Sequence, residues 1–192
     1  VETRCEELSH RIRARIGSFV YGEGDITMEQ VVGALLTEKG KTLAFAEACS
    51  GGLVSHRLTN VPGCSAYFQG TVIAYSDTAK TQLLGVQPLT LRQHGAVSEE
   101  TVREMAAGVR ERLGADLGVA VTGIAGPGGA TKERPIGTAC FALATDGTLV
   151  SRRYQLWGDR EWIKTLISQL ALDWVRRALL GIPIAESGFI RK

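Results

Sequence analysis

The chain has 192 residues, of which 44% are apolar and 22% charged, and its formal net charge is +2. These values predict one domain of ordinary size, with a proper core and room for a short appendage. The small net charge, with basic residues clustered only in pairs, argues against a dedicated nucleic-acid binder. No apolar run reaches the roughly 18 residues that a membrane span needs.

Thiol and imidazole side chains give no metal framework. They are dispersed, without a CxxC pair or a histidine at ligand spacing, at Cys5, Cys49, Cys64, Cys140, His10, His56 and His94. Scattered cysteines of this kind fit a reducing compartment. We therefore expect a cytoplasmic protein without a protein-built metal site.

The first 26 residues are predicted to form a segment of their own. Residues 3–16 read as an amphipathic helix that needs a partner surface. Its apolar residues at near-helical spacing are Cys5, Leu8, Ile12 and Ile16. A short β-like piece over 18–21 and a glycine-containing turn over 22–25 follow, and we place a boundary after them. The predicted division is a linker-like segment over 1–26, the main domain over 27–180 and a mobile tail over 181–192.

In the main domain, strand and helix patterns alternate. Thr27 and Gln30 form a capping box for a helix that ends at Gly40. The elements expected after it are a strand over 42–47, a helical segment after 48–52, a strand over 71–75, a helix over 77–84, a connection over 85–93, a helix over 99–113, a strand over 117–121, hairpin strands over 136–145 and 148–156, and a helix beginning at Asp159. This order implies an α/β sandwich with a mixed sheet.

The stretch from residue 42 to residue 80 looks like a site, because two strand-to-helix turns meet there. Gly51 and Gly52 let the backbone approach a ligand, and free N–H groups at a helix start favour an anion. The turn after Pro62 carries a thiol and a hydroxyl. The candidate residues of this stretch are Glu47, Cys49, Ser50, Ser65, Tyr75, Ser76 and Lys80.

Several of these residues have two interpretations. An ammonium at Lys80 would favour the phenolate of Tyr75, which could then take a proton from a serine nucleophile; the alternative is a solvated lysine and a half-buried tyrosine. Cys49 is either a nucleophile at a helix start or a buried structural cysteine. Glu47 either binds a ligand hydroxyl or amide, or is simply exposed.

A second glycine-rich turn spans residues 122–129. Its backbone N–H groups, from Thr122, Gly123 and Gly126 onward, could cradle a phosphate, and Lys132 and Arg134 follow closely. It matches neither the P-loop nor the dinucleotide fingerprint, so a tight structural loop is the alternative.

Six linked motifs resemble one family. They are A-E-A-C-S-G-G-L, P-G-C-S-A-Y-F-Q-G, A-Y-S-D-T-A-K, H-G-A-V-S-E-E-T, T-G-I-A-G-P-G-G and P-I-G-T, in this order. The chain is similar over about residues 27–178 to the C-terminal domain of the competence/damage-inducible protein CinA, a family that includes nicotinamide mononucleotide (NMN) amidohydrolases. Residues 1–26 resemble the end of the segment that joins this domain to an N-terminal nucleotide pyrophosphatase-like domain.

The resemblance implies a three-layer α/β/α sandwich with a mixed, mostly parallel sheet. It also implies hydrolysis of the carboxamide of NMN to nicotinic acid mononucleotide and ammonia, without an organic cofactor. The family's serine–tyrosine–lysine machinery maps onto Ser65, Tyr75 and Lys80, with an oxyanion held near the first glycine turn. We expect the phosphate at the second glycine turn, with Arg134, Arg160 or Lys164 as its cation.

Two departures from the family pattern bear on activity. The first motif is commonly A-E-S-C-T-G-G, but here Ala48 replaces the serine and Ser50 the threonine. Lys164 stands where an arginine is frequent. The alternative function is therefore a catalytically silent nucleotide-binding module that serves the N-terminal domain.

As partners we expect NMN and a second copy of the chain, since the apolar stripe of residues 5–16 calls for a covering surface. We expect neither a membrane partner nor direct contact with nucleic acid.

Overall fold

The computed structural model of the protein describes residues 2–184. Its centre is a five-stranded sheet in the order β2-β1-β3-β4-β5. The strands are β1 (Leu43–Glu47), β2 (Phe68–Ile73), β3 (Leu117–Gly123), β4 (Thr138–Thr145) and β5 (Thr148–Gln155). β1 pairs in parallel with β2 and β3, while β4 is antiparallel to β3 and β5, so β4 runs opposite to the other four. The prediction of a mixed α/β sheet is confirmed.

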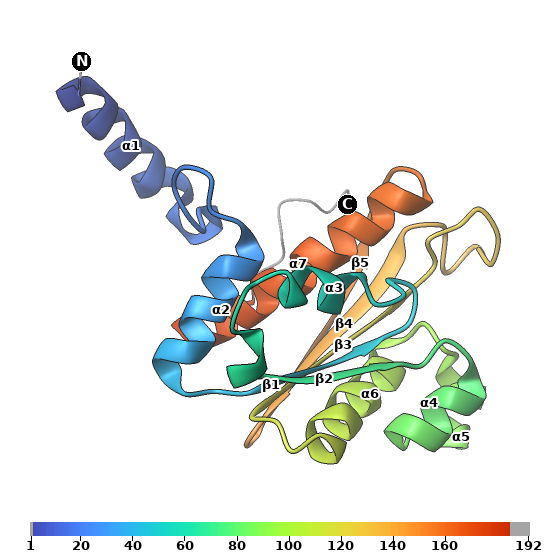
Figure 1. Ribbon diagram of the computed structural model, residues 1–192. Helices are drawn as coiled ribbons and strands as arrows, with labels where there is room; N and C mark the ends of the chain where they lie inside the picture. The colour runs from blue at the N-terminus through green and yellow to red at the C-terminus, as the bar shows by residue number, and fades with distance from the viewer. Residues whose placement is uncertain (1, 185–192) are drawn as a thin grey trace.

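Helices cover both faces of the sheet, which gives three layers (Figure 1). One face carries α2 (Met28–Lys39), α3 (Leu53–Thr59) and α7 (Arg160–Leu180). The other carries α4 (Asp77–Leu84), α5 (Pro88–His94) and α6 (Glu99–Arg112), with α6 packed directly on β1, β3 and β4. None of the described helices is long and apolar enough to cross a membrane.

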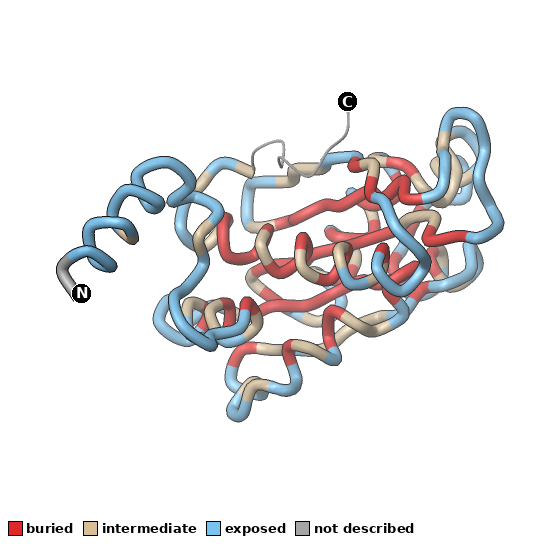
Figure 2. The backbone as a smooth tube through the Cα atoms, turned by 90° about the horizontal axis from the view of Figure 1, so that it is seen from above, coloured by how far each residue is buried: buried red, intermediate tan, exposed pale blue. Residues whose placement is uncertain are grey.

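The core is divided by the sheet into two apolar clusters. All five residues of β1 are buried, because helices cover both of its faces. Phe45 and Phe141 point to the α2/α7 side, where Phe141 packs edge-on against Tyr154 and tilted against Trp174. On the α6 side the strands present mainly alanine, which lets that helix approach closely. The buried strands at the centre are visible in Figure 2.

Local signals located the helix starts correctly. The capping box is formed, with Gln30 N donating to Thr27 Oγ1 and Thr27 N donating to Gln30 Oε1. Ser76, Ser98 and Asp159 each accept a backbone N–H of the helix that follows and cap its start. Such caps satisfy N–H groups that have no partner within the helix.

Three predicted elements differ from the structure. Residues predicted as β-like at 18–21 belong partly to a 3₁₀ turn, Gly17–Phe19. β2 begins at Phe68 and ends at Ile73, so the expected strand over 71–75 is displaced. The expected connection over 85–93 contains α5, which has proline in its first turn.

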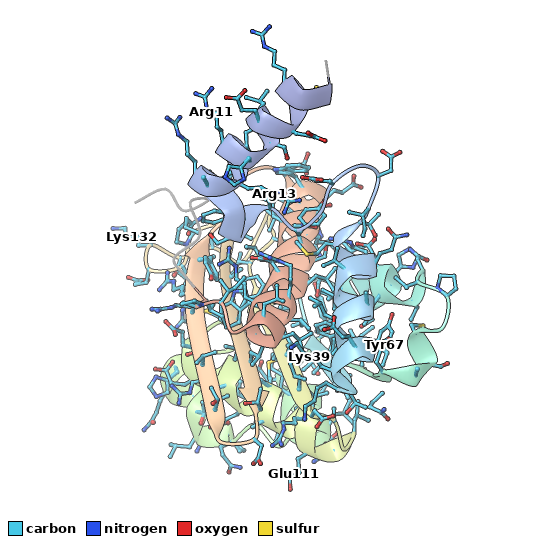
Figure 3. The ribbon with its side chains drawn as sticks, turned by 90° about the vertical axis from the view of Figure 1, so that its left-hand side faces the viewer. Arg11, Arg13, Lys39, Tyr67, Glu111 and Lys132 are labelled. Atoms are coloured by element: carbon cyan, nitrogen blue, oxygen red, sulfur yellow. The ribbon has the colours of Figure 1, made fainter. Side chains whose placement is uncertain are left out.

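The N-terminal helix α1 (Glu2–Ile16) stands away from the body of the domain, as Figures 1 and 3 show. The side chains of Leu8, Ile12 and Ile16 are about half exposed. The predicted amphipathic helix is therefore present, but its stripe has no covering surface within residues 2–184. Of the predicted tail over 181–192, residues 185–192 lie outside the described part of the chain.

The junction after α1 is held by the C-terminal half of α7. The guanidinium groups of Arg176 and Arg177 both donate to the carbonyl oxygen of Ser18, at 2.7 and 3.1 Å. Arg177 also lies 5.1 Å from the ring centre of Phe19. Asp173 pairs with both arginines at 2.6–2.7 Å, which compensates their burial.

Candidate active site

The candidate site lies where the three parallel strands end. Glu47, Ile73 and Gly123 are the last residues of β1, β2 and β3, and the strand register puts the ends of β1 and β2 side by side. The carboxyl edge of a parallel sheet is the usual place for a ligand, because the loops after the strands converge there. The motifs of the sequence contribute three such loops.

A pocket of about 220 Å³ opens between these loops. Ala48 and Cys49 contribute from the loop after β1, Tyr75 from the loop after β2 and Lys80 from α4. The glycine-rich loop after β3 and Arg160, the first residue of α7, complete the wall. The structure thus brings together Tyr75, Lys80, Cys49, Arg160 and the second glycine turn, all of which were predicted as site residues.

Lys80 lines the pocket and is only 2% exposed. Its Nζ donates to the carbonyl oxygen of Tyr75 at 3.3 Å and lies 3.7 Å from the carboxylate of Asp77. Burial lowers the pKa of the Lys80 ammonium, and the charge of Asp77 offsets only part of this effect. The pocket therefore contains a cation with little compensation from the protein.

The glycine-rich loop forms the open mouth of the pocket. Gly126 has φ +81°, a conformation that favours glycine, and Gly128 and Gly129 are exposed. None of the backbone N–H groups of Ala125, Gly126, Gly128 and Gly129 donates a hydrogen bond to a residue in 2–184. This wall therefore holds several unpaired donors, which suits an anion.

The two residues that open this loop line the pocket and also have structural roles. Thr122 lines the pocket, but its hydroxyl donates to the carbonyl oxygen of Ala96 at 3.0 Å. At Gly123 a side chain would collide with Thr138 and Ala139 of β4, so the glycine permits close strand pairing.

Arg160 connects two walls of the pocket. Its Nη1 donates to the carbonyl oxygen of Gly126 at 2.7 Å, and its Nη2 donates to Tyr75 Oη at 3.4 Å. Tyr75 is 65% exposed, so its phenol forms part of the pocket rim. Three cations were predicted to contact the phosphate, and Arg160 is the one of them that lines the pocket.

The other two cations are placed elsewhere. The guanidinium of Arg134 donates to the carbonyl oxygen of His94 at the end of α5 and lies against Gly95, which corrects its predicted role in substrate binding. Lys164 Nζ lies beside Gly51, on the side of the first glycine turn.

The first glycine turn is occupied by the protein itself. The carboxylate of Glu47 is fully buried and accepts five hydrogen bonds of 2.6–3.2 Å, from the side chains of Ser50 and Ser55 and the backbone N–H groups of Gly52, Val54 and Ser55. Gly51 N donates to the carbonyl oxygen of Ala48. The predicted substrate-binding roles of Glu47, Ser50 and Gly52 are therefore wrong, because this carboxylate caps the start of α3. Gly51 is not among the residues that line the pocket, and an oxyanion held near the first glycine turn stays a prediction.

Ser65 does not join Tyr75 and Lys80. It lies in a 3₁₀ turn (Cys64–Ala66) before β2, whereas Tyr75 lies after that strand. Phe68, at the start of β2, pairs with the first residue of β1, and five strand steps of about 3.3 Å then separate Phe68 from Ile73, roughly 17 Å in all. The predicted serine–tyrosine–lysine set is therefore not assembled within one chain.

Cys49 matches the structural interpretation of that residue better than the nucleophilic one. Burial raises the pKa of its thiol to about 12, so it is a thiol and not a thiolate near neutral pH. Its side chain is 8% exposed and packs in the apolar cluster on the α7 side.

Sequence reasoning missed the contribution of the segment before α6. Ala96 and Val97 line the pocket between the glycine-rich loop and Lys80. Both belong to the motif H-G-A-V-S-E-E-T, so the signal was present. Apolar side chains of this kind carry no recognisable chemistry in a sequence.

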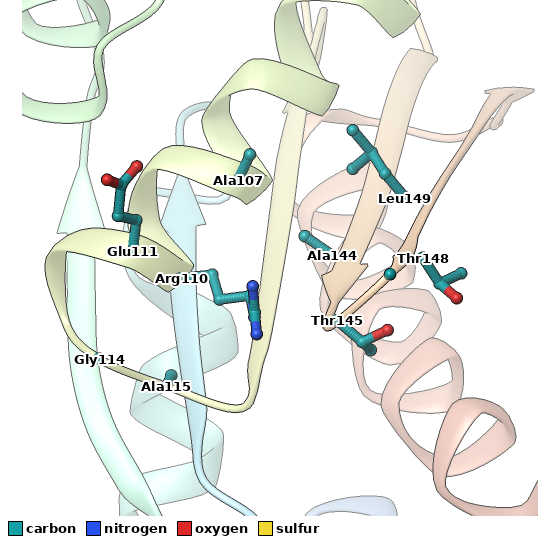
Figure 4. Close-up of a pocket in the computed structure, with 10 residues that line it drawn as sticks. Ala107, Arg110, Glu111, Gly114, Ala115, Ala144, Thr145, Thr148 and Leu149 are labelled. Carbon is teal, nitrogen blue, oxygen red and sulfur yellow. The ribbon is translucent and has the colours of Figure 1, made fainter.

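A larger hollow, of about 540 Å³, lies at the other end of the sheet (Figure 4). It is formed by the end of α6 and the β4–β5 hairpin. Its cation, Arg110, already donates to the carbonyl oxygen of Asp116 at 3.0 Å. Its lining contains no cysteine, histidine or lysine, so it offers less chemistry than the smaller pocket.

Comparison with known sequences agrees with the motifs. The family model of the CinA C-terminal domain matches residues 25–179. A putative competence-damage inducible protein of Alkaliphilus metalliredigens is 47% identical over 181 residues, which are 94% of this chain and 44% of that protein. A CinA-like protein of Geotalea uraniireducens is 47% identical over 92% of this chain and 42% of its own length. The chain thus spans less than half of the curated relatives it matches.

Solved structures show the same fold. The competence/damage inducible protein CihA from Agrobacterium tumefaciens is 35% identical with a TM-score of 0.76, over 80% of this chain and 93% of that one. A competence or damage-inducible protein from Enterobacter asburiae is 34% identical with a TM-score of 0.76, over 81% and 99%.

Proposed function

Because the chain belongs to the CinA C-terminal domain family, we propose that its carboxyl-edge pocket binds a small phosphorylated pyridine nucleotide of the NMN type. One observation carries the proposal: unpaired backbone N–H groups of the glycine-rich loop lie in the same pocket as Arg160 and Lys80. A phosphate is mostly dianionic near neutral pH, and backbone N–H groups with an arginine are its usual partners in proteins.

Binding without rapid hydrolysis is the function that the geometry favours. A serine nucleophile must lie within hydrogen-bond reach of its base, and Ser65 lies before the start of β2 and does not line the pocket. Ser50 is buried and donates to Glu47, while Cys49 is a neutral thiol. Ala48 lines the pocket at the position where the family motif commonly carries serine.

Deamidation of NMN to nicotinic acid mononucleotide and ammonia is the second candidate function. It is favoured by the position of Tyr75 and Lys80 in one pocket, and by the lowered pKa of Lys80, which brings a base closer to neutral pH. The nucleophile would then be a water molecule and not a serine of this chain.

Calorimetric titration with NMN and an ammonia assay separate the two functions. We expect saturable binding and slow or absent ammonia release by the wild type. Ala48→Ser should raise ammonia release, because it places a hydroxyl in the pocket that Tyr75 and Lys80 also line. Ser65→Ala is the control and should change neither measurement. The proposal would be contradicted if the wild type released ammonia rapidly and Ser65→Ala abolished this release. It would also fail if NMN did not bind.

A further inference from the structure

The ammonium of Lys80 is a buried charge with few partners. It has three N–H donors, but the described acceptors near it are one backbone carbonyl at 3.3 Å and one carboxylate at 3.7 Å. That carboxylate, on Asp77, belongs to a side chain that is 63% exposed. Solvent therefore screens the Asp77 carboxylate and weakens its stabilisation of the Lys80 ammonium.

The pocket lining is positive and rich in hydrogen-bond donors. Lys80 contributes a buried ammonium, and the glycine-rich loop contributes unpaired N–H groups with Arg160 beside them. Among the described residues that line the pocket there is no aspartate or glutamate. Both Lys80 and the glycine-rich loop therefore attract negative charge.

We propose that the pocket selects ligands that are anionic at both ends, a phosphate and a carboxylate, and that Lys80 is the residue that sets this selection. The inference rests on the proposed function and deepens it: of the pyridine mononucleotides, the carboxylate form (nicotinic acid mononucleotide) binds more tightly than the carboxamide form (NMN). A carboxylate forms a charge-assisted hydrogen bond with a buried ammonium, whereas a carboxamide offers only a neutral oxygen.

The preference for the carboxylate ligand over the carboxamide ligand should change with pH in one direction. The groups that face Lys80 are Asp77 and Tyr75 near its own helix start, Cys49 from the loop after β1, and Arg160 through the Tyr75 hydroxyl. A bound carboxylate favours the ammonium and raises the pKa of Lys80 above its lowered value in the free protein. Affinity for the carboxylate ligand therefore falls as pH rises through that free-protein pKa, and binding above it takes up a proton. The carboxamide ligand shows neither effect.

Calorimetry with both mononucleotides and both ribosides tests the proposal. At neutral pH the wild type should bind the acid mononucleotide about tenfold more tightly than NMN, the ratio that roughly 1.4 kcal/mol produces. Lys80→Met should remove this ratio. Lys164→Met deletes the same charge outside the pocket lining and should keep it. Proton uptake, measured on the wild type at increasing pH in two buffers of different ionisation enthalpy, should appear for the carboxylate ligand as pH rises through the free-protein pKa of Lys80. It needs no variant and stays decisive if Lys80→Met does not fold.

The outcomes separate the two claims. If neither mononucleotide binds, the proposed function fails. If both bind with equal affinity and without proton uptake, the pocket binds nucleotides but Lys80 does not select the carboxylate, and this inference is overturned. A preference that survives in a folded Lys80→Met variant would also overturn the role of Lys80.

Discussion

Replacing Glu47 by glutamine tests whether this carboxylate is the structural centre of the first loop. One carboxylate oxygen accepts hydrogen bonds from Ser50 Oγ, Gly52 N and Val54 N, and the other accepts from Ser55 N and Ser55 Oγ. Glutamine has nearly the same shape, but its amide nitrogen donates. In Glu47→Gln, at least one buried backbone N–H therefore faces another donor.

The cost follows from these contacts. Leaving one buried N–H without an acceptor costs about 1–3 kcal/mol, and the remaining bonds lose the assistance of the charge. We expect Glu47→Gln to lower the free energy of unfolding by roughly 3–5 kcal/mol, within the range for breaking a buried charge network. For a chain of this length the melting temperature should fall by roughly 10 °C.

Urea unfolding followed by circular dichroism measures this change. Glu38→Gln is the matched control, because Glu38 is exposed on α2 and makes no described side-chain hydrogen bond; it should alter stability by less than about 0.5 kcal/mol. A Glu47→Gln variant as stable as the control would refute the reasoning. It would mean that Glu47 is free to contact a ligand, as the sequence first suggested.

Three further outcomes are expected. The Tyr67 hydroxyl is buried without a partner among the described residues, so Tyr67→Phe should raise the free energy of unfolding in urea by about 1 kcal/mol; a loss of that size would reveal a partner. Hydrogen bonds from Thr42 lower the pKa of Asp116, so its stabilisation is present above the unfolded pKa of about 3.9 and is lost as pH falls through the lower folded pKa. The stability difference between wild type and Asp116→Asn should therefore shrink in acid, and a constant difference would contradict this. Arg160→Ala should weaken binding of NMN more than of its riboside, measured by calorimetry; equal losses would show that Arg160 does not act on the phosphate.

The helix starts were predictable because their signals are local. Thr27, Ser76 and Asp159 each accept an N–H group only three residues ahead, so the sequence contains both partners. The family motifs likewise identified Tyr75, Lys80 and the second glycine turn, which meet in the pocket.

The position of Ser65 was not predictable from such signals. Gly70 is a weak strand former, and it concealed the first half of β2. If the first half of β2 were a loop, Ser65 could reach Tyr75. Because it is a strand, it holds the two residues apart. The role of Glu47 was hidden for a related reason, because its donors come from a loop and helix start whose geometry the sequence does not specify.

Helix α7 connects the α1 junction with the pocket. Arg177 holds Ser18 near one end and Arg160 holds Gly126 and Tyr75 at the other, about 26 Å apart at 1.5 Å per residue. No proline or glycine interrupts residues 160–180, and ten residues of this helix are buried in the core. The α1 junction and the mouth of the pocket are therefore attached to one continuous, packed element.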